Sequence, residues 1–395
     1  MLQKVAIIIE RTDVALGGAE RSIAEVVQAM SNLGLEVTLL SAKGRSEAPD
    51  THVLCRHVPG KRVTLSVFEE ALAGHLADHR YDVIHSVLPF AFCDVYQPRG
   101  GTYAESMRRN IASYASGPVQ WYKRITAPAN LRRTRLLAAE RRLCQRPNGP
   151  AIAALSQYVA DQFQEHYATD PQRIALILNG VKTDRPVETA AADELRARIF
   201  TSLRHGKKND PVLFLFAAHN FRLKGLDRLI KAFATVAHND VERNIGLVVV
   251  GAGKTEGYRQ LAGRLGLENR IAFLGPIGEI QNALSVVDVG ILPTFYDPSS
   301  RFILETLVAG KPAITTRYNG AVDHFTNGRH GKVVDEPEDI VALAEAIRYF
   351  ADKTNVAKAM QAIAQDDLKE RISVRRVARE LSGLYESILE RKGRV

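Results

Sequence analysis

The sequence has few cysteines and no long apolar run. Its three cysteines are far apart and outside any CxxC spacing, which argues against a disulfide framework and against a zinc site. No stretch approaches the roughly 18 consecutive apolar residues that a membrane-spanning helix needs. The apolar run near the N-terminus ends at Glu10 and is too short for a signal-peptide core. These absences favour a reducing, cytoplasmic setting.

Acidic residues are almost missing from one segment. Residues 107–146 hold ten Lys or Arg against the single acid Glu140, which is about the whole net charge of +9. Tyr114, Trp121 and Tyr122 lie among these bases, and such a mixture suits a surface that meets anionic lipid headgroups or a phosphorylated substrate. A solvated helix face is the alternative, and nucleic acid is disfavoured because no recognition module accompanies the segment. The residues assigned to this acceptor or membrane patch are Arg108, Arg109, Trp121, Lys123, Arg124, Arg132 and Arg133.

Apolar runs typical of buried strands alternate with helix-like segments along the chain. This alternation predicts parallel sheets covered by helices on both faces. The expected strands are residues 4–9, 36–40, 83–85, 152–155, 212–217, 247–250, 271–274, 289–292 and 312–315. The expected helices are residues 19–33, 226–237, 340–350 and 374–391, with a further helix that begins at Gln157 after the N-cap Ser156. The polar stretch 182–210 interrupts the rhythm, and 395 residues suffice for two domains.

Two glycine-rich turns follow expected strands. Gly17 and Gly18 open the first helix, where glycines let the backbone approach a phosphate and free N–H groups attract an anion. A plain turn is the alternative. The turn at 251–253 is not a P-loop, because Val248 stands where that motif needs glycine. A dinucleotide fingerprint is also disfavoured, because the third glycine comes one place late.

Basic residues follow the strand expected at 212–217. Arg222 and Lys224 lie beyond its carboxyl end, just before a helix. Bases at such a position can clamp a diphosphate and neutralise the charge that builds on a leaving group. Exposed loop bases are common, however, so a solvated loop is the alternative for this pair taken alone.

Two acidic residues flank the helix start that follows the strand expected at 289–292. Asp297 and Glu305 are eight positions apart. If residues 298–301 form the turn, the aspartate lies in the loop and the glutamate lies about one turn into the helix. Two acceptors would then flank a helix N-terminus whose N–H groups can point at a bound phosphate. A capping acid with an unrelated glutamate is the alternative.

Taken in this order, the segments resemble glycosyltransferase family 4, the retaining transferases of GT-B fold. The chain is most similar to the bacterial lipopolysaccharide-core glucosyltransferases among them, and the match covers nearly the whole chain. The segments that carry the resemblance are residues 154–181, Lys224-Gly225, Gly251-Ala252-Gly253, Phe273-Leu274-Gly275 and residues 293–312.

The resemblance implies an α/β fold of GT-B type, with two Rossmann-like, doubly wound parallel-sheet domains facing across a cleft. Residues 1–183 are then expected to bind the acceptor, and residues 184–373 are expected to bind a nucleotide-diphosphate-sugar donor. The C-terminal helix, residues 374–395, is expected to pack back on the first domain. The donor-binding residues that follow are Gly17, Gly18, Gly251, Gly253, Ser299, Ser300, Arg301, Phe302 and Glu305.

The resemblance also assigns chemical roles. It places Asp297 near the transferred sugar, Glu305 at the ribose hydroxyls and Lys224 at the diphosphate, with Arg222 replacing an arginine that relatives carry upstream. Asp297 departs from the family's glutamate, and Ser300 departs from its glycine. Relatives often carry a His or Asp in the first domain where this chain has glycine, which leaves Arg99 and Asp94 as candidates for that role. The predicted catalytic residues are Asp297, Lys224, Arg222 and Arg99.

The resemblance therefore implies a retaining hexosyltransferase that moves glucose from UDP-glucose to a lipopolysaccharide core or another lipid-linked glycan. No cofactor or metal is expected, because Lys224, Arg222 and the helix start supply positive potential. The enzyme is expected in the cytoplasm, peripheral on the inner face of the cell membrane, with no nucleic-acid partner. A nucleotide-sugar epimerase of the same fold and a catalytically inactive membrane scaffold are the alternatives.

Overall fold

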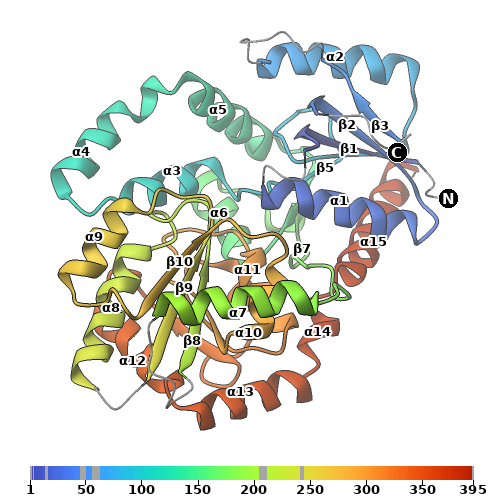
Figure 1. Cartoon of the computed structure of the whole chain (residues 1–395). Coiled ribbons are helices and arrows are strands. Elements are labelled where there is room, and N and C mark those ends of the chain that lie inside the picture. The colour runs from blue at the N-terminus through green and yellow to red at the C-terminus, as the bar shows by residue number, and fades with distance from the viewer. Residues whose placement is uncertain are drawn as a thin grey trace. The chain divides into compact units, whose positions relative to one another are not determined.

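The chain folds into two compact units, which the computed structural model shown in Figure 1 describes at residues 2, 4–13, 17–44, 50–55, 63–203, 211–240 and 244–393. The first unit comprises Met1–Met107, Ile125–Lys182 and Ser373–Val395. The second comprises Arg108–Arg124 and Thr183–Ile372. The segment Arg108–Arg124 thus packs with the second unit, although the sequence division at residue 183 placed it in the first domain.

The first unit is built on a parallel sheet of seven strands in the order β3-β2-β1-β4-β5-β6-β7. Its strands are β1 (Lys4–Arg11), β2 (Glu36–Lys43), β3 (Thr51–Val53), β4 (Val83–Ser86), β5 (Val95–Tyr96), β6 (Ala151–Ala154) and β7 (Ile174–Leu176). In β1 the run Val5–Ile9 is buried at every position. A parallel strand covered on both faces requires such a continuous apolar run.

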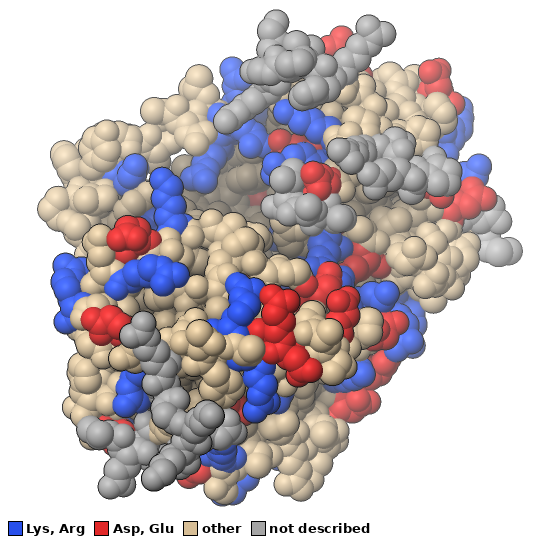
Figure 2. Space-filling view, in the orientation of Figure 1, with Lys and Arg blue, Asp and Glu red and all other residues tan. Residues whose placement is uncertain are grey.

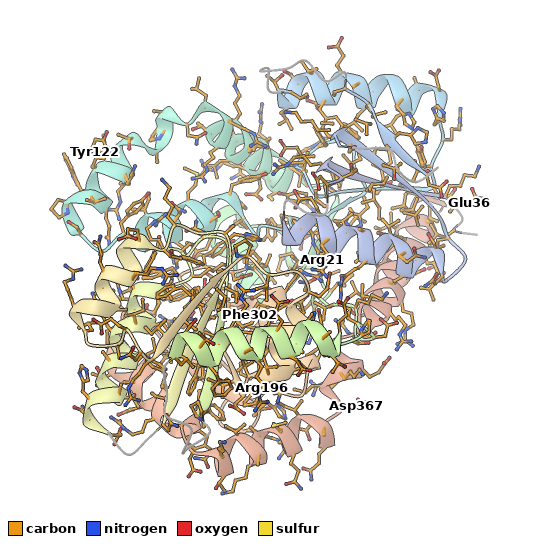
Figure 3. All side chains as sticks on the ribbon, viewed as in Figure 1. Arg21, Glu36, Tyr122, Arg196, Phe302 and Asp367 are labelled. Atoms are coloured by element: carbon orange, nitrogen blue, oxygen red, sulfur yellow. The ribbon has the colours of Figure 1, made fainter. Side chains whose placement is uncertain are left out.

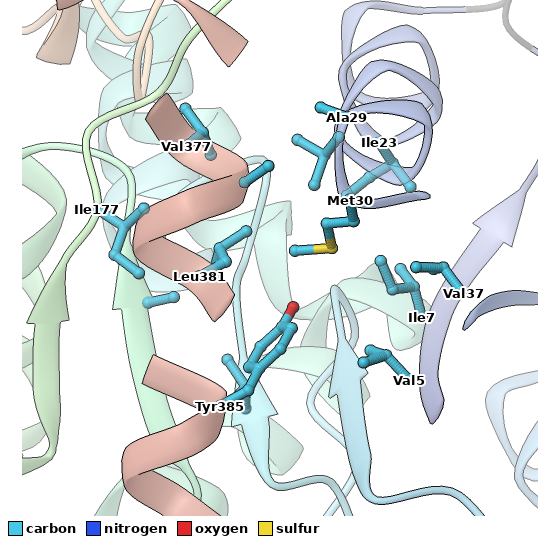
Figure 4. Close-up of a cluster of buried hydrophobic side chains, with 14 of the residues drawn as sticks. Val5, Ile7, Ile23, Ala29, Met30, Val37, Ile177, Val377, Leu381 and Tyr385 are labelled. Atoms are coloured by element: carbon cyan, nitrogen blue, oxygen red, sulfur yellow. The ribbon is translucent and has the colours of Figure 1, made fainter. Parts of the chain in front are cut away.

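Helices cover both faces of this sheet. They are α1 (Gly18–Ser31), α2 (Leu65–Asp78), α3 (Tyr103–Ala112), α5 (Leu131–Gln145), α6 (Gln157–Tyr167) and α15 (Val374–Gly393), with α3 continuing into the second unit. Figure 4 shows Met30 of α1 and Leu381 and Tyr385 of α15 converging in the core on one face. The apolar spacing of α15 follows the helical period, so one stripe of side chains is buried along its length.

The second unit has its own parallel sheet of six strands in the order β10-β9-β8-β11-β12-β13. These strands are β8 (Val212–Ala217), β9 (Ile245–Val250), β10 (Ile271–Gly275), β11 (Val289–Leu292), β12 (Ala313–Thr316) and β13 (Gly331–Val334). The helices are α4 (Gly117–Thr126, whose last two residues belong to the first unit), α7 (Thr189–Leu203), α8 (Leu226–Asn239), α9 (Glu256–Arg264), α10 (Ile280–Val286), α11 (Arg301–Val308), α12 (Ile340–Phe350), α13 (Lys353–Gln365) and α14 (Leu368–Arg371).

Each unit therefore has the Rossmann-like architecture expected from the alternating pattern, and the fold class is confirmed. The strands expected from the sequence are all present, with ends that differ by a few residues. Ser156 is the N-cap of α6 as expected, because its side chain accepts a hydrogen bond from the N–H of Val159. Among the helices of the described ranges, none combines the length and the apolar character that crossing a bilayer requires.

Candidate functional site

The strand order of the second sheet reverses between β8 and β11. In open parallel sheets, ligands bind at the carboxyl ends of the strands on either side of such a reversal, because the two flanking loops diverge there. The loop after β8 carries Lys224, and the loop after β11 carries Asp297. Two of the predicted catalytic residues thus meet at the position where this topology favours a ligand.

Lys224 and Asp297 form an ion pair. The Lys224 ammonium lies 2.7 Å from Asp297 Oδ2 and also donates to the carbonyl oxygen of Tyr296 at 2.8 Å. The other carboxylate oxygen of Asp297 accepts a hydrogen bond from the N–H of Ser299 at 3.2 Å. The two charged side chains are 18% and 15% exposed, so water screens their attraction only in part.

Gly225 explains how the two loops come so close. Its φ of +76° lies in the left-handed region, and a Cβ at this position would lie 2.1 Å from the carbonyl oxygen of Pro293. The N–H of Phe295 then donates to the carbonyl of Leu223 at 2.9 Å, which joins the loop after β11 to the loop after β8. Glycine is required here both for its backbone angle and for the missing side chain.

Asn319, in the loop after β12, holds the start of α11 and was not predicted from the sequence. Its side-chain oxygen accepts hydrogen bonds from the N–H of Ser300 at 3.0 Å and of Ala321 at 3.1 Å, and its amide donates to Thr315 Oγ1 at 2.9 Å. Ser300 caps α11 through its hydroxyl. The Ser300 N–H predicted to meet a ligand is therefore bonded to Asn319 in this structure.

Glu305 lies one turn into α11, as the sequence predicted. Its carboxylate is 3.1 Å from the guanidinium of Arg301, and the two side chains are 8% and 11% exposed. Phe302, which is labelled in Figure 3, follows Arg301 in the sequence, and its side chain is buried. The start of α11 thus carries Arg301 in its first turn and Glu305 one turn later, and it follows the Asp297 loop. Within the described ranges, no group of three or more His, Cys, Asp and Glu side chains is placed to hold a metal ion.

Arg222 is not brought to the Lys224–Asp297 pair. Its guanidinium donates to the carbonyl oxygen of Asn110 at 2.9 Å and to the hydroxyl of Ser113. It also lies 3.7 Å from the ring centroid of Tyr114. The predicted diphosphate-binding residue therefore anchors the segment between α3 and α4 to the loop after β8.

The glycines at 251 and 253 are explained by packing. A Cβ on Gly251 would lie 1.8 Å from the carbonyl oxygen of Ala218, and a Cβ on Gly253 would lie 2.6 Å from the ring of Phe221. The turn after β9 therefore closes against the loop after β8. The resemblance assigns both glycines to the donor site, and in this structure their close neighbours are Ala218 and Phe221 of the loop after β8.

The remaining predicted residues of the first unit lie at separate positions. Gly17 and Gly18 begin α1, and the Glu20 carboxylate stands against Gly17. Arg99 donates to Gln97 Oε1 at 3.1 Å and to Asn179 Oδ1 at 2.8 Å, and it also contacts the hydroxyl of Ser22.

Asp94, the other candidate, precedes β5. It accepts from the N–H of Ile84 at 2.9 Å and pairs with Lys392 at 2.6 Å, so its contacts join β5 to its neighbour β4 and to α15.

The basic patch is divided between the two units. In the second unit, Arg109 stacks 3.4 Å from the ring centroid of Tyr318, while Arg108 and Arg124 are exposed and Lys123 lies 5.6 Å from the ring centroid of Tyr114. Trp121 is 66% exposed, and Tyr122, labelled in Figure 3, is 58% exposed.

In the first unit, Arg132 pairs with Glu10, and Arg133 is exposed. Both belong to α5, along which Figure 2 shows Lys and Arg side chains on the face that it views. The single basic segment of the sequence thus forms two surfaces with different neighbours.

Family models match most of the chain in two consecutive pieces. The model described as Glycosyltransferase Family 4 matches residues 16–185, and the model described as Glycosyl transferases group 1 matches residues 199–367. The chain belongs to the GT-B glycosyltransferases. The lipopolysaccharide glucosyltransferase WaaG of Escherichia coli (strain K12) is 24% identical to this glycosyltransferase over 336 residues, which cover 84% of this chain and 85% of WaaG.

Other relatives match over shorter stretches. A D-inositol 3-phosphate glycosyltransferase of Streptomyces coelicolor is 28% identical over 217 residues, which cover 51% of this chain and 47% of that protein.

Solved structures match almost the whole chain. The crystal structure of WaaG superposes with a TM-score of 0.66 at 22% identity, covering 98% of both chains. Anabaena HepE in complex with UDP-glucose gives a TM-score of 0.68 at 17% identity, covering 97% of this chain and 99% of HepE. These structural likenesses bear on the fold alone.

Proposed function

We propose that this glycosyltransferase moves glucose from UDP-glucose to a lipid-linked glycan, such as a lipopolysaccharide core, with retention of the anomeric configuration. The observation that carries the proposal is the Lys224–Asp297 pair beside the start of α11, at the strand reversal of the second sheet. WaaG, named for the same activity, supports the choice of sugar and acceptor. The complex of HepE with UDP-glucose supports the choice of donor.

In the proposed reaction, the donor diphosphate replaces Asp297 as the partner of Lys224. The ammonium and the N-terminus of α11 then stabilise the negative charge that develops on the leaving diphosphate. Asp297 supports the reacting sugar, and Glu305 binds the ribose hydroxyls. Because these groups supply positive potential without a metal ion, we propose that the step is metal-independent.

The bond changes balance without a further reactant. The bond from the anomeric carbon to the diphosphate oxygen breaks, and a bond from the same carbon to the acceptor oxygen forms on the same face. The acceptor hydroxyl proton passes to the departing phosphate oxygen. The products are UDP and the glucosylated acceptor, and the exclusion of water from the site limits hydrolysis of the donor.

Steady-state kinetics with UDP-glucose tests this function. We expect Lys224→Ala, which loses a charged transition-state contact, and Glu305→Ala, which loses the hydrogen bonds to the ribose, each to lower kcat/KM by about a hundredfold or more. Lys254→Ala, at an exposed position of the same unit, serves as the matched control and should leave the rate unchanged. A wild-type protein that neither transfers nor hydrolyses any nucleotide-sugar would support an inactive scaffold. Conversion of the donor to an epimer without acceptor would support an epimerase.

We also propose that α4 attaches the enzyme to the inner face of the cell membrane. No residue of α4 is buried, and Val119, Trp121, Tyr122 and Ile125 are 39%, 66%, 58% and 57% exposed. Aromatic and aliphatic side chains beside Lys123 and Arg124 suit the interface of an anionic bilayer.

The chain has one tryptophan, so fluorescence reports on this helix directly. The emission of Trp121 should shift to shorter wavelength with vesicles containing phosphatidylglycerol, and should not shift with vesicles of phosphatidylcholine alone. Tyr122→Ala should weaken sedimentation with the anionic vesicles. Val341→Ala, at a position that is 68% exposed elsewhere in the same unit, should have no effect. Unchanged emission with both vesicles would refute the attachment.

A further inference from the structure

A groove in the first unit lies between α2 and α5. It consists of two adjoining cavities, of about 200 Å³ and about 670 Å³, which share Leu65 of α2 and Arg135 of α5 in their walls. The smaller cavity reaches Glu10 at the end of β1 and Leu88 just after β4. The order of the first sheet reverses between these two strands, so this cavity occupies the position at which such a sheet favours a ligand.

One side of the groove carries a row of arginines. Three arginines of α5 line the two cavities, together with Arg146 just after its last residue, and helical spacing places the three on one face: Arg132, Arg135 and Arg142. Arg132 and Arg142 are separated by about 15 Å at the helical rise of about 1.5 Å per residue. Two acids line the same groove, because Glu10 pairs with Arg132 at one end and Glu69 of α2 lines the larger cavity. The groove therefore offers an excess of positive charge over an extended length.

The floor of the groove is apolar. Phe68, Leu88 and Leu136 line the smaller cavity, and Phe90 and Leu143 line the larger one. A saccharide needs many hydrogen-bonding partners, whereas these side chains offer only apolar surface. An alkyl chain gains free energy by leaving water for such a surface.

We propose that the groove between α2 and α5 binds one molecule of an acidic lipid, with the alkyl chain on the apolar floor and the phosphate against the arginines of α5. Guanidinium groups suit this headgroup, because they donate paired hydrogen bonds to phosphate oxygens. This site differs from the proposed α4 surface. The groove would bind one lipid molecule, whereas α4 would contact the surface of a bilayer. The proposal does not depend on the donor chemistry, and its test uses no nucleotide-sugar.

Calorimetry with dodecyl phosphate, below its critical micelle concentration, tests the site on the full chain. We expect saturable binding of one molecule per chain. Inorganic phosphate and glucose 6-phosphate carry the anion without the chain, and dodecyl maltoside carries the chain without the anion. We expect at least about tenfold weaker binding for each of these three probes, since each lacks one of the two contacts.

Neighbouring positions on α5 provide matched controls. Ala139 and Arg135 line the groove, whereas Ala138 and Arg141 are exposed on α5 and are not among the residues that line the two cavities. Ala139→Phe should fill the groove, Arg135→Gln should remove a headgroup contact, and each should weaken dodecyl phosphate binding by about tenfold. Ala138→Phe and Arg141→Gln should leave the affinity within about twofold.

Each contrary outcome has a defined meaning. If glucose 6-phosphate or inorganic phosphate bound as tightly as dodecyl phosphate, the ligand would be a phosphosugar or a free anion and not a lipid. If dodecyl maltoside bound as tightly as dodecyl phosphate, the arginines would not contribute to binding. Equal loss in Ala138→Phe and Ala139→Phe would place the ligand elsewhere. Thermal unfolding of all four variants distinguishes loss of the site from loss of the fold, and a folded Ala139→Phe with undiminished binding would overturn the proposal.

Discussion

Replacement of Asp297 by asparagine removes the charge of this side chain and nearly preserves its shape. In the structure the Asp297 carboxylate lies 2.7 Å from the Lys224 ammonium and neutralises its charge. A nucleoside diphosphate must compete with that carboxylate for the ammonium and must also approach a second negative charge. We therefore expect Asp297→Asn to bind UDP more tightly than the wild type, while its rate of sugar transfer falls.

The size of the effect follows from the geometry. Two unit charges at 2.7 Å attract by about 6 kcal/mol at an effective dielectric constant of about 20. Partial exposure lowers this figure, desolvation of the two ions offsets much of it, and the asparagine oxygen still accepts a hydrogen bond from Lys224. A net gain of about 1–2 kcal/mol for UDP binding is expected, which is about tenfold in the dissociation constant.

Calorimetry with UDP, at one ionic strength, measures this gain. Asp193→Asn removes the charge of an exposed acid on α7 and controls for the change in net charge. Asp297→Glu restores the charge with one more methylene, so its affinity for UDP should return toward that of the wild type. An Asp297→Asn protein that binds UDP no more tightly than Asp193→Asn would show that the ion pair does not oppose diphosphate binding.

Two stability predictions accompany this one. Gly225→Ala should destabilise the fold by about 2 kcal/mol or more in urea unfolding, because its Cβ would meet the carbonyl of Pro293, whereas Gly257→Ala, with open space around it, should not. Burial raises the pKa of Glu140 to about 7, so stability should fall by about 3 kcal/mol as the pH rises from about 4.5 to 7. This contribution is fully present below the unfolded pKa and is lost as the pH passes the folded pKa. Glu140→Gln should flatten the slope, and an unchanged slope would contradict the assignment.

The strands with long apolar runs could be predicted from the sequence. The apolar run Val212–Ala217 predicted a strand, and five consecutive residues of β8 are buried. β5 was missed because it has only two residues, Val95 and Tyr96, and its place between β4 and β6 is fixed by its neighbours. β13 was missed because Gly331 and Lys332 interrupt its apolar character. Strands of this kind depend on the sheet around them more than on their own side chains.

A residue of the candidate site could be predicted from the sequence only where its position after a strand indicates its role. Lys224 and Asp297 each lie in the loop after a strand, so the topology of parallel strands brings them to one edge. Asn319 acts through hydrogen bonds to the start of α11, nineteen residues away in the sequence. An Asn-Gly pair after a strand indicates a turn, but it does not tell which N–H groups the side chain will accept from.

Arg222 shows why the basic segment could not be understood as one surface. Its contacts with Asn110 and Tyr114 fasten the end of α3 to the loop that carries Lys224, and Arg109 stacks on Tyr318. The carbonyl of Tyr318 in turn accepts from the N–H of Asp297. Positive charge in this part of the segment is therefore used to hold α4 beside the two candidate loops. The arginines of α5 belong to the first unit, where they line the groove between α2 and α5. The basic segment is continuous in the sequence, but its residues form two separate surfaces.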